Sequence, residues 1–287
     1  MSKKMIQANG VDLCTESFGN PTDPTLLLNA GGCLSMVWWP QDFCRKLAEA
    51  GRYVIRYDYR DTGRSITYKP GQIHYSWDDL TDDAVGVLDA YGVDRAHLFG
   101  WSMGGMITQL VALKHPERVI TITLIMSKPF ASVSSDVPTV ESEEFLSHFA
   151  RGQTLDWADE AVVIDYTVES WRLTAAGSKH PFDEISIRAL ATEDVKRANN
   201  NLSSSNHALI SGGDRYSNRH REIKIPTLVI HGTADPMVNY QNGVTLAEEI
   251  PNATLLTLEG TAHELHRDDW DTIIDAIIQH TQQVRVN

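Results

Sequence analysis

The chain has 287 residues, 42% of them hydrophobic, so it can bury the core of one large domain that carries an insertion. Its formal net charge of −13 argues against nucleic-acid binders and against proteins of anionic membrane surfaces, because both need basic fields. The three cysteines, Cys14, Cys33 and Cys44, form no CxxC pair and no zinc-ligand spacing, which predicts a reducing compartment and no metal. The N-terminal residues lack the apolar core of a signal peptide, so we expect a cytoplasmic location.

Short, almost continuously apolar runs recur along the chain, with longer segments between them. They cover residues 25–30, 52–58, 96–100, 119–126, 226–232 and 253–259. Such runs are typical of parallel strands that are buried on both faces. Before them, residues 10–18 alternate between polar and apolar, which predicts a half-exposed antiparallel edge strand. Residues 76–92 have apolar side chains at steps of three and four, which predicts a helix capped by Ser76 and ended by Gly92. This order predicts an α/β fold with helices on both faces of the sheet.

One long interval breaks the alternation of strands and helices. Helix-like patches occur at residues 140–152, 157–177 and 182–201, without a convincing strand among them. We therefore predict a helical cap, residues 127–223, inserted into a core formed by residues 1–126 and 224–287.

The stretch Gly100-Trp101-Ser102-Met103-Gly104-Gly105 lies between an apolar run and a helical pattern. It fits the nucleophile elbow G-x-S-x-G, in which a strained turn needs small residues two positions before and after the serine. A phosphate-binding loop would need a Gly-Lys-Ser/Thr sequence, but the next lysine is Lys114. The pattern predicts that Ser102 is a nucleophile.

A nucleophilic serine needs a histidine as its base and an acid that orients the histidine. In sites with a nucleophile elbow, both follow the serine along the chain, the acid before the histidine. Asp235 follows the run at 226–232, and His263 follows the run at 253–259. Both positions lie at strand carboxyl ends, on the same edge of the sheet as Ser102. The alternatives that stay open are His266 for the base, and Asp214 or Asp165 for the acid.

The oxyanion of an ester-cleaving site needs two hydrogen-bond donors. Met103 offers one backbone N–H, and the loop at residues 30–35 offers another from Gly32 or Cys33. A nucleophilic role for Cys33 is disfavoured, since no histidine and aspartate accompany it in the required arrangement. The residues expected to contact substrate are Gly31, Cys33 and Trp101.

At these residues the chain resembles the α/β-hydrolase superfamily over nearly its full length. The resemblance implies an eight-stranded, mostly parallel sheet, a helical cap after the sixth strand, and the triad Ser102, Asp235 and His263. The segment at 57–65 is similar to the family's D-x-R-G-x-G-x-S turn, with Asp61 where Gly is commoner. In detail the chain looks most like the aclacinomycin methylesterase group. Epoxide hydrolases and dehalogenases have Asp at the elbow, so Ser102 argues against both classes.

These features together predict a serine esterase that cleaves small alkyl or methyl esters of hydrophobic acids without a cofactor. Alternatives are a cofactor-free perhydrolase, a C–C hydrolase or lyase, and a non-catalytic ligand receptor on the same fold. The expected partner is a small-molecule ester, and a homodimer is left open. We expect two or three cap aromatics to line the pocket, with Trp157 and Trp171 as first candidates. The cap aromatics are Phe130, Phe145, Phe149, Trp157, Tyr166, Trp171 and Phe182.

Overall fold

A single sheet of eight strands forms the centre of the computed structural model, which describes residues 2–131 and 143–282. The strands are β1 (Ser2–Ala8), β2 (Val11–Phe18), β3 (Thr25–Asn29), β4 (Tyr53–Tyr57), β5 (Ala96–Trp101), β6 (Val119–Ile125), β7 (Thr227–Gly232) and β8 (Ala253–Leu258). Their order is β1-β2-β4-β3-β5-β6-β7-β8. Strand β2 is antiparallel to β1 and β4, and the other neighbours are parallel. The predicted mostly parallel, eight-stranded sheet is confirmed.

Two expectations about the margins of the sheet are wrong. Strand β2 is not an edge strand, because β1 pairs with all of its residues except Phe18, and most of β2 is buried. Strand β8 is the opposite edge and is largely half-buried, although its apolar run predicts burial on both faces. The number of neighbours that a strand has depends on the rest of the chain, so its own pattern does not determine it.

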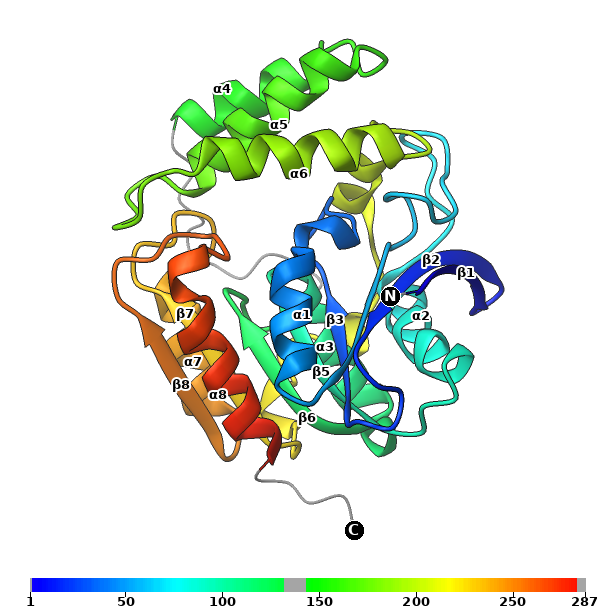
Figure 1. Ribbon diagram of the computed structural model, residues 1–287, viewed down its shortest axis with the longest axis vertical. Coiled ribbons are helices and arrows are strands. Elements are labelled where there is room, and N and C mark those ends of the chain that lie inside the picture. Colours follow the sequence, from blue (N-terminus) through cyan, green and yellow to red (C-terminus); the bar gives the residue numbers. More distant parts are fainter. Residues whose placement is uncertain (1, 132–142, 283–287) are drawn as a thin grey trace.

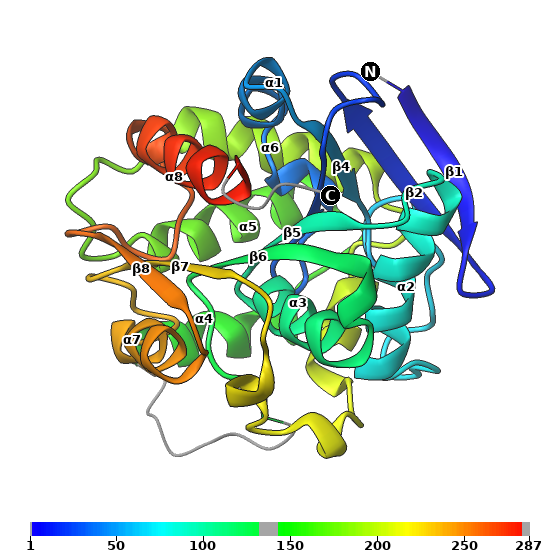
Figure 2. The same cartoon turned by 90° about the horizontal axis from the view of Figure 1, so that it is seen from below.

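Helices cover both faces of the sheet (Figure 2). Helices α1 (Gln41–Glu49) and α8 (Trp270–Gln282) lie on one face, and α2 (Trp77–Ala90), α3 (Met103–Lys114) and α7 (Tyr240–Glu249) lie on the other. The predicted helix at 76–92 is α2. The side chain of Ser76 accepts a hydrogen bond from the N–H of Asp79, and the Asp79 carboxylate accepts one from the N–H of Ser76. This capping box satisfies two backbone N–H groups at the start of the helix.

The predicted helical cap follows β6. Its helices α4 (Glu143–Gly152), α5 (Glu160–Thr174) and α6 (Glu184–Arg197) lie together across the top of Figure 1. The short 3-10 helices η3 (Ser203–Leu209), η4 (Asp214–Tyr216) and η5 (His220–Glu222) lead back to β7, and the described residues between β6 and β7 contain no strand. Residues 132–142 of the predicted cap lie outside the described residues, and the boundaries at 127 and 223 stay predictions. None of the described helices is long and apolar enough to cross a membrane.

Side chains of α6 fasten the cap to the core. The guanidinium of Arg197 donates two hydrogen bonds, of 2.9 and 2.7 Å, to the buried carboxylate of Asp58, which follows β4. One turn earlier, the carboxylate of Asp194 accepts from Ser35 Oγ and, at 2.7 Å, from Trp38 Nε1. Ser35 caps the 3-10 helix η1 (Met36–Trp38), which leads into α1. The cap is therefore bonded directly to the loop that follows β3.

Candidate active site

Ser102 occupies a strained turn between β5 and α3, with φ 54° and ψ −117°. Close packing around the turn explains the glycines that flank the serine. A Cβ atom on Gly100 would collide with the carbonyl oxygen of Gly104, and one on Gly104 would collide with that of Asn29 in β3. A serine in this conformation costs on the order of 1–3 kcal/mol, which the surrounding contacts must offset. The turn leaves the Ser102 side chain partly exposed at the carboxyl end of β5.

The loops after β7 and β8 bring Asp235 and His263 together. The N–H of Ala234 donates to the carbonyl oxygen of Thr261 at 3.1 Å, which joins the two loops. His263 Nδ1 lies 2.8 Å from Asp235 Oδ2, and both side chains are buried. A carboxylate only accepts, so Nδ1 carries the proton and Nε2 of His263 is left as a base.

The environment of Asp235 favours its ionised form. Its Oδ1 accepts the backbone N–H groups of Met237 and Val238, each at 2.8 Å. Burial raises the pKa of this carboxyl, but the interactions with the imidazoles of His263 and His231 outweigh burial and hold the pKa below its ordinary value. In this arrangement an ionised Asp235 can orient the imidazole and can stabilise an imidazolium formed by protonation of His263.

The imidazole and the elbow lie next to each other. The ring of His263 is 6.1 Å, centroid to centroid, from the ring of Trp101, the residue before Ser102. In the described part of the chain, no hydrogen bond joins the Ser102 hydroxyl to His263, and such bonds are often long until substrate binds. Gly31 is also close, since a Cβ atom on it would lie 3.8 Å from that of Ser102.

The alternative acids and the alternative base lie elsewhere. Asp165 is exposed on α5 and pairs with Arg188 at 2.6 Å, while Asp214 is exposed at the start of η4. His266 stacks on His180 of the cap, with ring centroids 4.1 Å apart. Of the candidates, only His263 and Asp235 form an acid–base pair within the described residues.

The loop after β3 lies close to the elbow. A Cβ atom on Gly32 would lie 3.6 Å from that of Met103, the first residue of α3. Cys33 has φ 61°, and its N–H donates to Nδ1 of His207, a cap residue, at 2.9 Å. The Cys33 N–H therefore already has a partner, and we take the N–H of Gly32 as the candidate for the second oxyanion donor. His207 could not be identified from the sequence, since it belongs to no motif and reaches the loop only through the fold.

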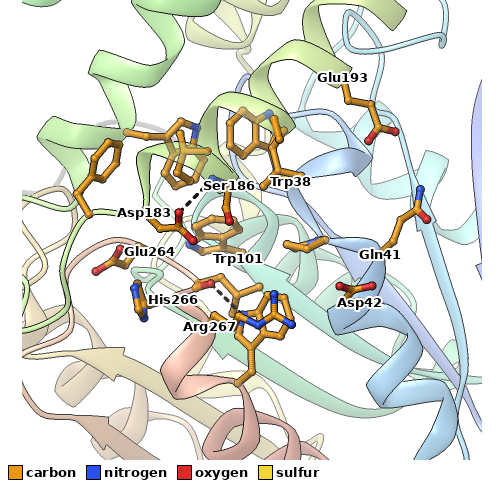
Figure 3. A pocket seen from close by; sticks show the side chains of 18 of the residues that line it. Trp38, Gln41, Asp42, Trp101, Asp183, Ser186, Glu193, Glu264, His266 and Arg267 are labelled. Atoms are coloured by element: carbon orange, nitrogen blue, oxygen red, sulfur yellow. Dashed lines mark hydrogen bonds between the residues drawn. The ribbon is translucent and has the colours of Figure 1, made fainter.

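A cavity of about 480 Å³ lies beside Trp101, between α6, the start of α1 and the loop before α8 (Figure 3). Its aromatic wall consists of Trp38, Trp101, Trp171, Phe182 and Trp270, and its acidic residues are Asp42, Asp183, Glu193 and Glu264. Trp38 and Trp171 are stacked with centroids 4.5 Å apart. Burial raises the pKa of Glu264, which follows His263. Ser102 is not part of this wall, so the cavity adjoins the elbow through Trp101 and does not enclose it.

Only some of the cap aromatics reach this cavity. Trp171 and Phe182 line it, whereas Trp157 donates its Nε1–H to the carbonyl oxygen of Gly152 and packs on Tyr166 inside the cap. The expectation for Trp171 agrees with the structure, and the expectation for Trp157 is wrong. Trp157 precedes α5, donates to the end of α4 and packs on Tyr166 of α5, and its spacing in the sequence does not show this.

One group of possible metal ligands also crosses from the cap to the core. His180, His266 and Asp268 bring ligand atoms within 4.8 Å of one another. The two imidazoles are nearly parallel, at 4°, so their lone pairs lie in separate planes and do not converge on one point. In this arrangement the three side chains do not form a metal site.

Comparison with known proteins agrees with this geometry. A family model described as alpha/beta hydrolase fold matches residues 24–269. The rhodomycin D methylesterase DauP of Streptomyces sp. (strain C5) is 35% identical over 306 aligned residues, and DnrP of Streptomyces peucetius is 34% identical; each alignment covers 100% of both chains. The solved esterase RhEst1 from Rhodococcus sp. ECU1013 superposes with a TM-score of 0.75 at 21% identity, over 99% of this chain and 100% of that one. The chain belongs to the α/β-hydrolase fold family.

Proposed function

We propose that this chain hydrolyses methyl and other small alkyl esters of hydrophobic carboxylic acids through an acyl-enzyme on Ser102. The chain is a carboxylic ester hydrolase of the α/β fold, similar over its full length to two methylesterases. The observation that carries the proposal is the 2.8 Å contact between His263 Nδ1 and Asp235 Oδ2, beside a serine held in an elbow.

The proposed reaction has two halves. Nε2 of His263 takes the proton of Ser102 Oγ as this oxygen attacks the ester carbonyl, and the N–H groups of Gly32 and Met103 stabilise the oxyanion. The tetrahedral intermediate collapses, and His263 returns the proton to the departing alkoxide, which leaves as the alcohol. Water then attacks the acyl group in the same way and releases the acid.

The cavity beside Trp101 supports the preference for hydrophobic acyl groups. Its volume lies within the ~300–1,000 Å³ range of small-molecule sites, and aromatic rings supply much of its wall. The net charge of −13 on the whole chain disfavours anionic substrates. A planar or lipophilic acyl group with a small alcohol is the substrate that these surfaces accept.

The nucleophile is tested with a fluorophosphonate probe. We expect the wild-type protein to be labelled on Ser102 and Ser102→Ala to escape labelling. The Ser102→Ala variant should also lose on the order of 10⁵–10⁶ in kcat while its melting temperature changes little. Turnover by a folded Ser102→Ala protein, or a wild-type protein that hydrolyses esters but resists the probe, would contradict the proposal.

The substrate class is tested with p-nitrophenyl esters from acetate to hexanoate, beside methyl esters, diketones, and acids with hydrogen peroxide. Each buried methylene adds up to ~0.8 kcal/mol of binding, so kcat/KM should first rise with chain length. Trp171→Phe should shift this profile by a few-fold, whereas Trp157→Phe, a matched change away from the cavity, should not. Preferred turnover of the diketones would point to a C–C hydrolase, and perhydrolysis faster than hydrolysis to a perhydrolase.

We also propose that the enzyme is cytoplasmic, as the sequence predicts. The sequence leaves a homodimer open. Sedimentation velocity on the full chain measures the oligomeric state.

A further inference from the structure

His207 is a buried histidine that the proposed reaction does not use, and only 6% of its surface is exposed. It lies in η3, in the segment between β6 and β7, far along the chain from the loop that it contacts. Its Nε2 lies 2.9 Å from the carbonyl oxygen of Arg60, and its Nδ1 accepts the N–H of Cys33 at 2.9 Å. A carbonyl oxygen only accepts, so Nε2 must carry the proton.

These two contacts fix the chemistry of the ring. With the proton on Nε2, Nδ1 has a free lone pair and can hold the Cys33 N–H. Burial lowers the pKa of His207, and this effect exceeds the opposing ones of the Arg60 carbonyl and the Asp61 charge. The neutral tautomer is therefore the form that both neighbours require.

The support beneath His207 is also built from buried contacts. Asp61, at φ 66°, accepts from Tyr75 Oη at 2.8 Å and from Asn206 Nδ2 at 3.0 Å. Ser203 Oγ, from the same 3-10 helix, donates to the carbonyl oxygen of Asp61 at 2.9 Å. The helix that carries His207 thus packs on the turn after β4. The imidazole of His207 is held by its contacts with Arg60 and Cys33.

The loop that His207 holds includes the proposed oxyanion donor. Cys33 adopts a left-handed conformation at φ 61°, which a residue with a side chain adopts only when its surroundings hold it there. The preceding residue, Gly32, lies against Met103 at the start of α3. Movement of the Cys33 peptide would move the Gly32 peptide with it, because the two are consecutive.

We propose that His207 is a positioning residue for the oxyanion hole: it takes the N–H of Cys33 and so keeps the neighbouring Gly32 N–H in place for the substrate. The inference rests on the proposed ester hydrolysis. It assigns to the cap segment a part in the chemical step, in addition to its place in the wall of the cavity.

Two substitutions separate the two contacts of the ring. In His207→Asn the amide oxygen can reach the place of Nδ1 and accept from Cys33, while the bond to Arg60 is lost. In His207→Gln the longer amide reaches the place of Nε2 and can donate to Arg60, while Cys33 loses its acceptor. His97→Gln is the matched control, since His97 is also buried but lies near the start of β5, at the opposite end of that strand from Ser102.

The measurements are kcat and KM with p-nitrophenyl butyrate, affinity for a trifluoromethyl ketone that mimics the oxyanion, and melting temperature. A misplaced donor costs on the order of 10- to 100-fold. We expect His207→Gln to lose this factor in kcat and in ketone affinity with KM nearly unchanged. The His207→Asn variant should stay within a few-fold of wild type, and His97→Gln should keep its kcat even where its melting temperature falls.

The inference is overturned if the His207→Gln and His207→Asn variants lose activity equally, or if His207→Gln keeps its kcat and its ketone affinity. Should His207→Gln fail to fold, the His207→Asn variant decides alone, because a 10-fold loss in a folded protein that keeps the acceptor would contradict the proposal. If the wild-type chain itself neither cleaves esters nor reacts with the fluorophosphonate, the proposed function fails instead. The wild-type measurements therefore distinguish the two failures.

Discussion

The carboxyl ends of the parallel strands, where Ser102 lies, and the cap above them are held by different kinds of contact. At the strand ends, the backbone sets the geometry: φ 54° at Ser102, and two N–H groups on Asp235. In the cap, side chains do so, through the bonds of Arg197 to Asp58 and the stacking of Trp171 on the core. The proposed reacting groups therefore lie where the backbone has little freedom, whereas the cap, which we propose selects substrates, is joined to the core by side-chain contacts.

The largest loss of activity should come from a change at the carboxyl ends of the strands. In Asp235→Asn, the amide presents a donor to His263 Nδ1, so the imidazole proton shifts to Nε2 and the base is lost. We expect kcat to fall by on the order of 10⁴ while the fold persists. Asp165→Asn, an exposed change in the cap, is the control and should leave kcat unchanged. A loss below 10-fold in Asp235→Asn would mean that another acid orients the base.

The same variant has a signature in stability. The pKa of Asp235 is lower in the folded chain than its ordinary value of 3.8, so the unfolded chain binds more protons as the pH falls below that value. The stability that Asp235 contributes is thus complete above about pH 5 and is lost as the pH falls through the folded pKa. In urea titrations between pH 3 and 7, the difference between wild type and Asp235→Asn should shrink toward pH 3.

The cap should show its largest effect in stability. Arg197→Met leaves the buried carboxylate of Asp58 without its charged partner, which costs about 3–5 kcal/mol of unfolding free energy. Arg188→Met removes a cation from the same helix, but its partners Asp165 and Glu184 are exposed, so the urea midpoint should stay in place. Equal midpoints for the two variants would show that the Arg197 pair does not hold the cap.

The smallest effect concerns the strain at the elbow. Ser102→Gly removes the side chain that opposes φ 54° and so relieves the backbone strain of the folded chain. Part of this stabilisation is offset by the conformational freedom of glycine in the unfolded chain. We expect a net stabilisation of about 1 kcal/mol, whereas Ser102→Ala, which keeps the Cβ atom, should gain little. If glycine and alanine have equal urea midpoints, the elbow stores no strain.

Much of the fold could be predicted because each parallel strand is a short apolar run bounded by turn residues. The elbow could be predicted because its glycines follow from local collisions, and Asp235 and His263 because each follows such a run. The strand at Ser2–Ala8 was missed, since its polar residues hide a strand that is paired on one side only. His207, Asp194 and Trp270 could not be found, because each acts through contacts with distant segments and belongs to no motif.

The order of the strands has a consequence for how the chain acquires activity. Ser102, Asp235 and His263 follow β5, β7 and β8, and β7 joins β6 only after the whole intervening cap segment. Closing so long a loop is slow compared with the formation of helices, so helical structure can form before the three groups meet. During refolding, recovery of ester turnover would therefore lag behind the far-ultraviolet helix signal, and its rate would measure the pairing of β6 with β7.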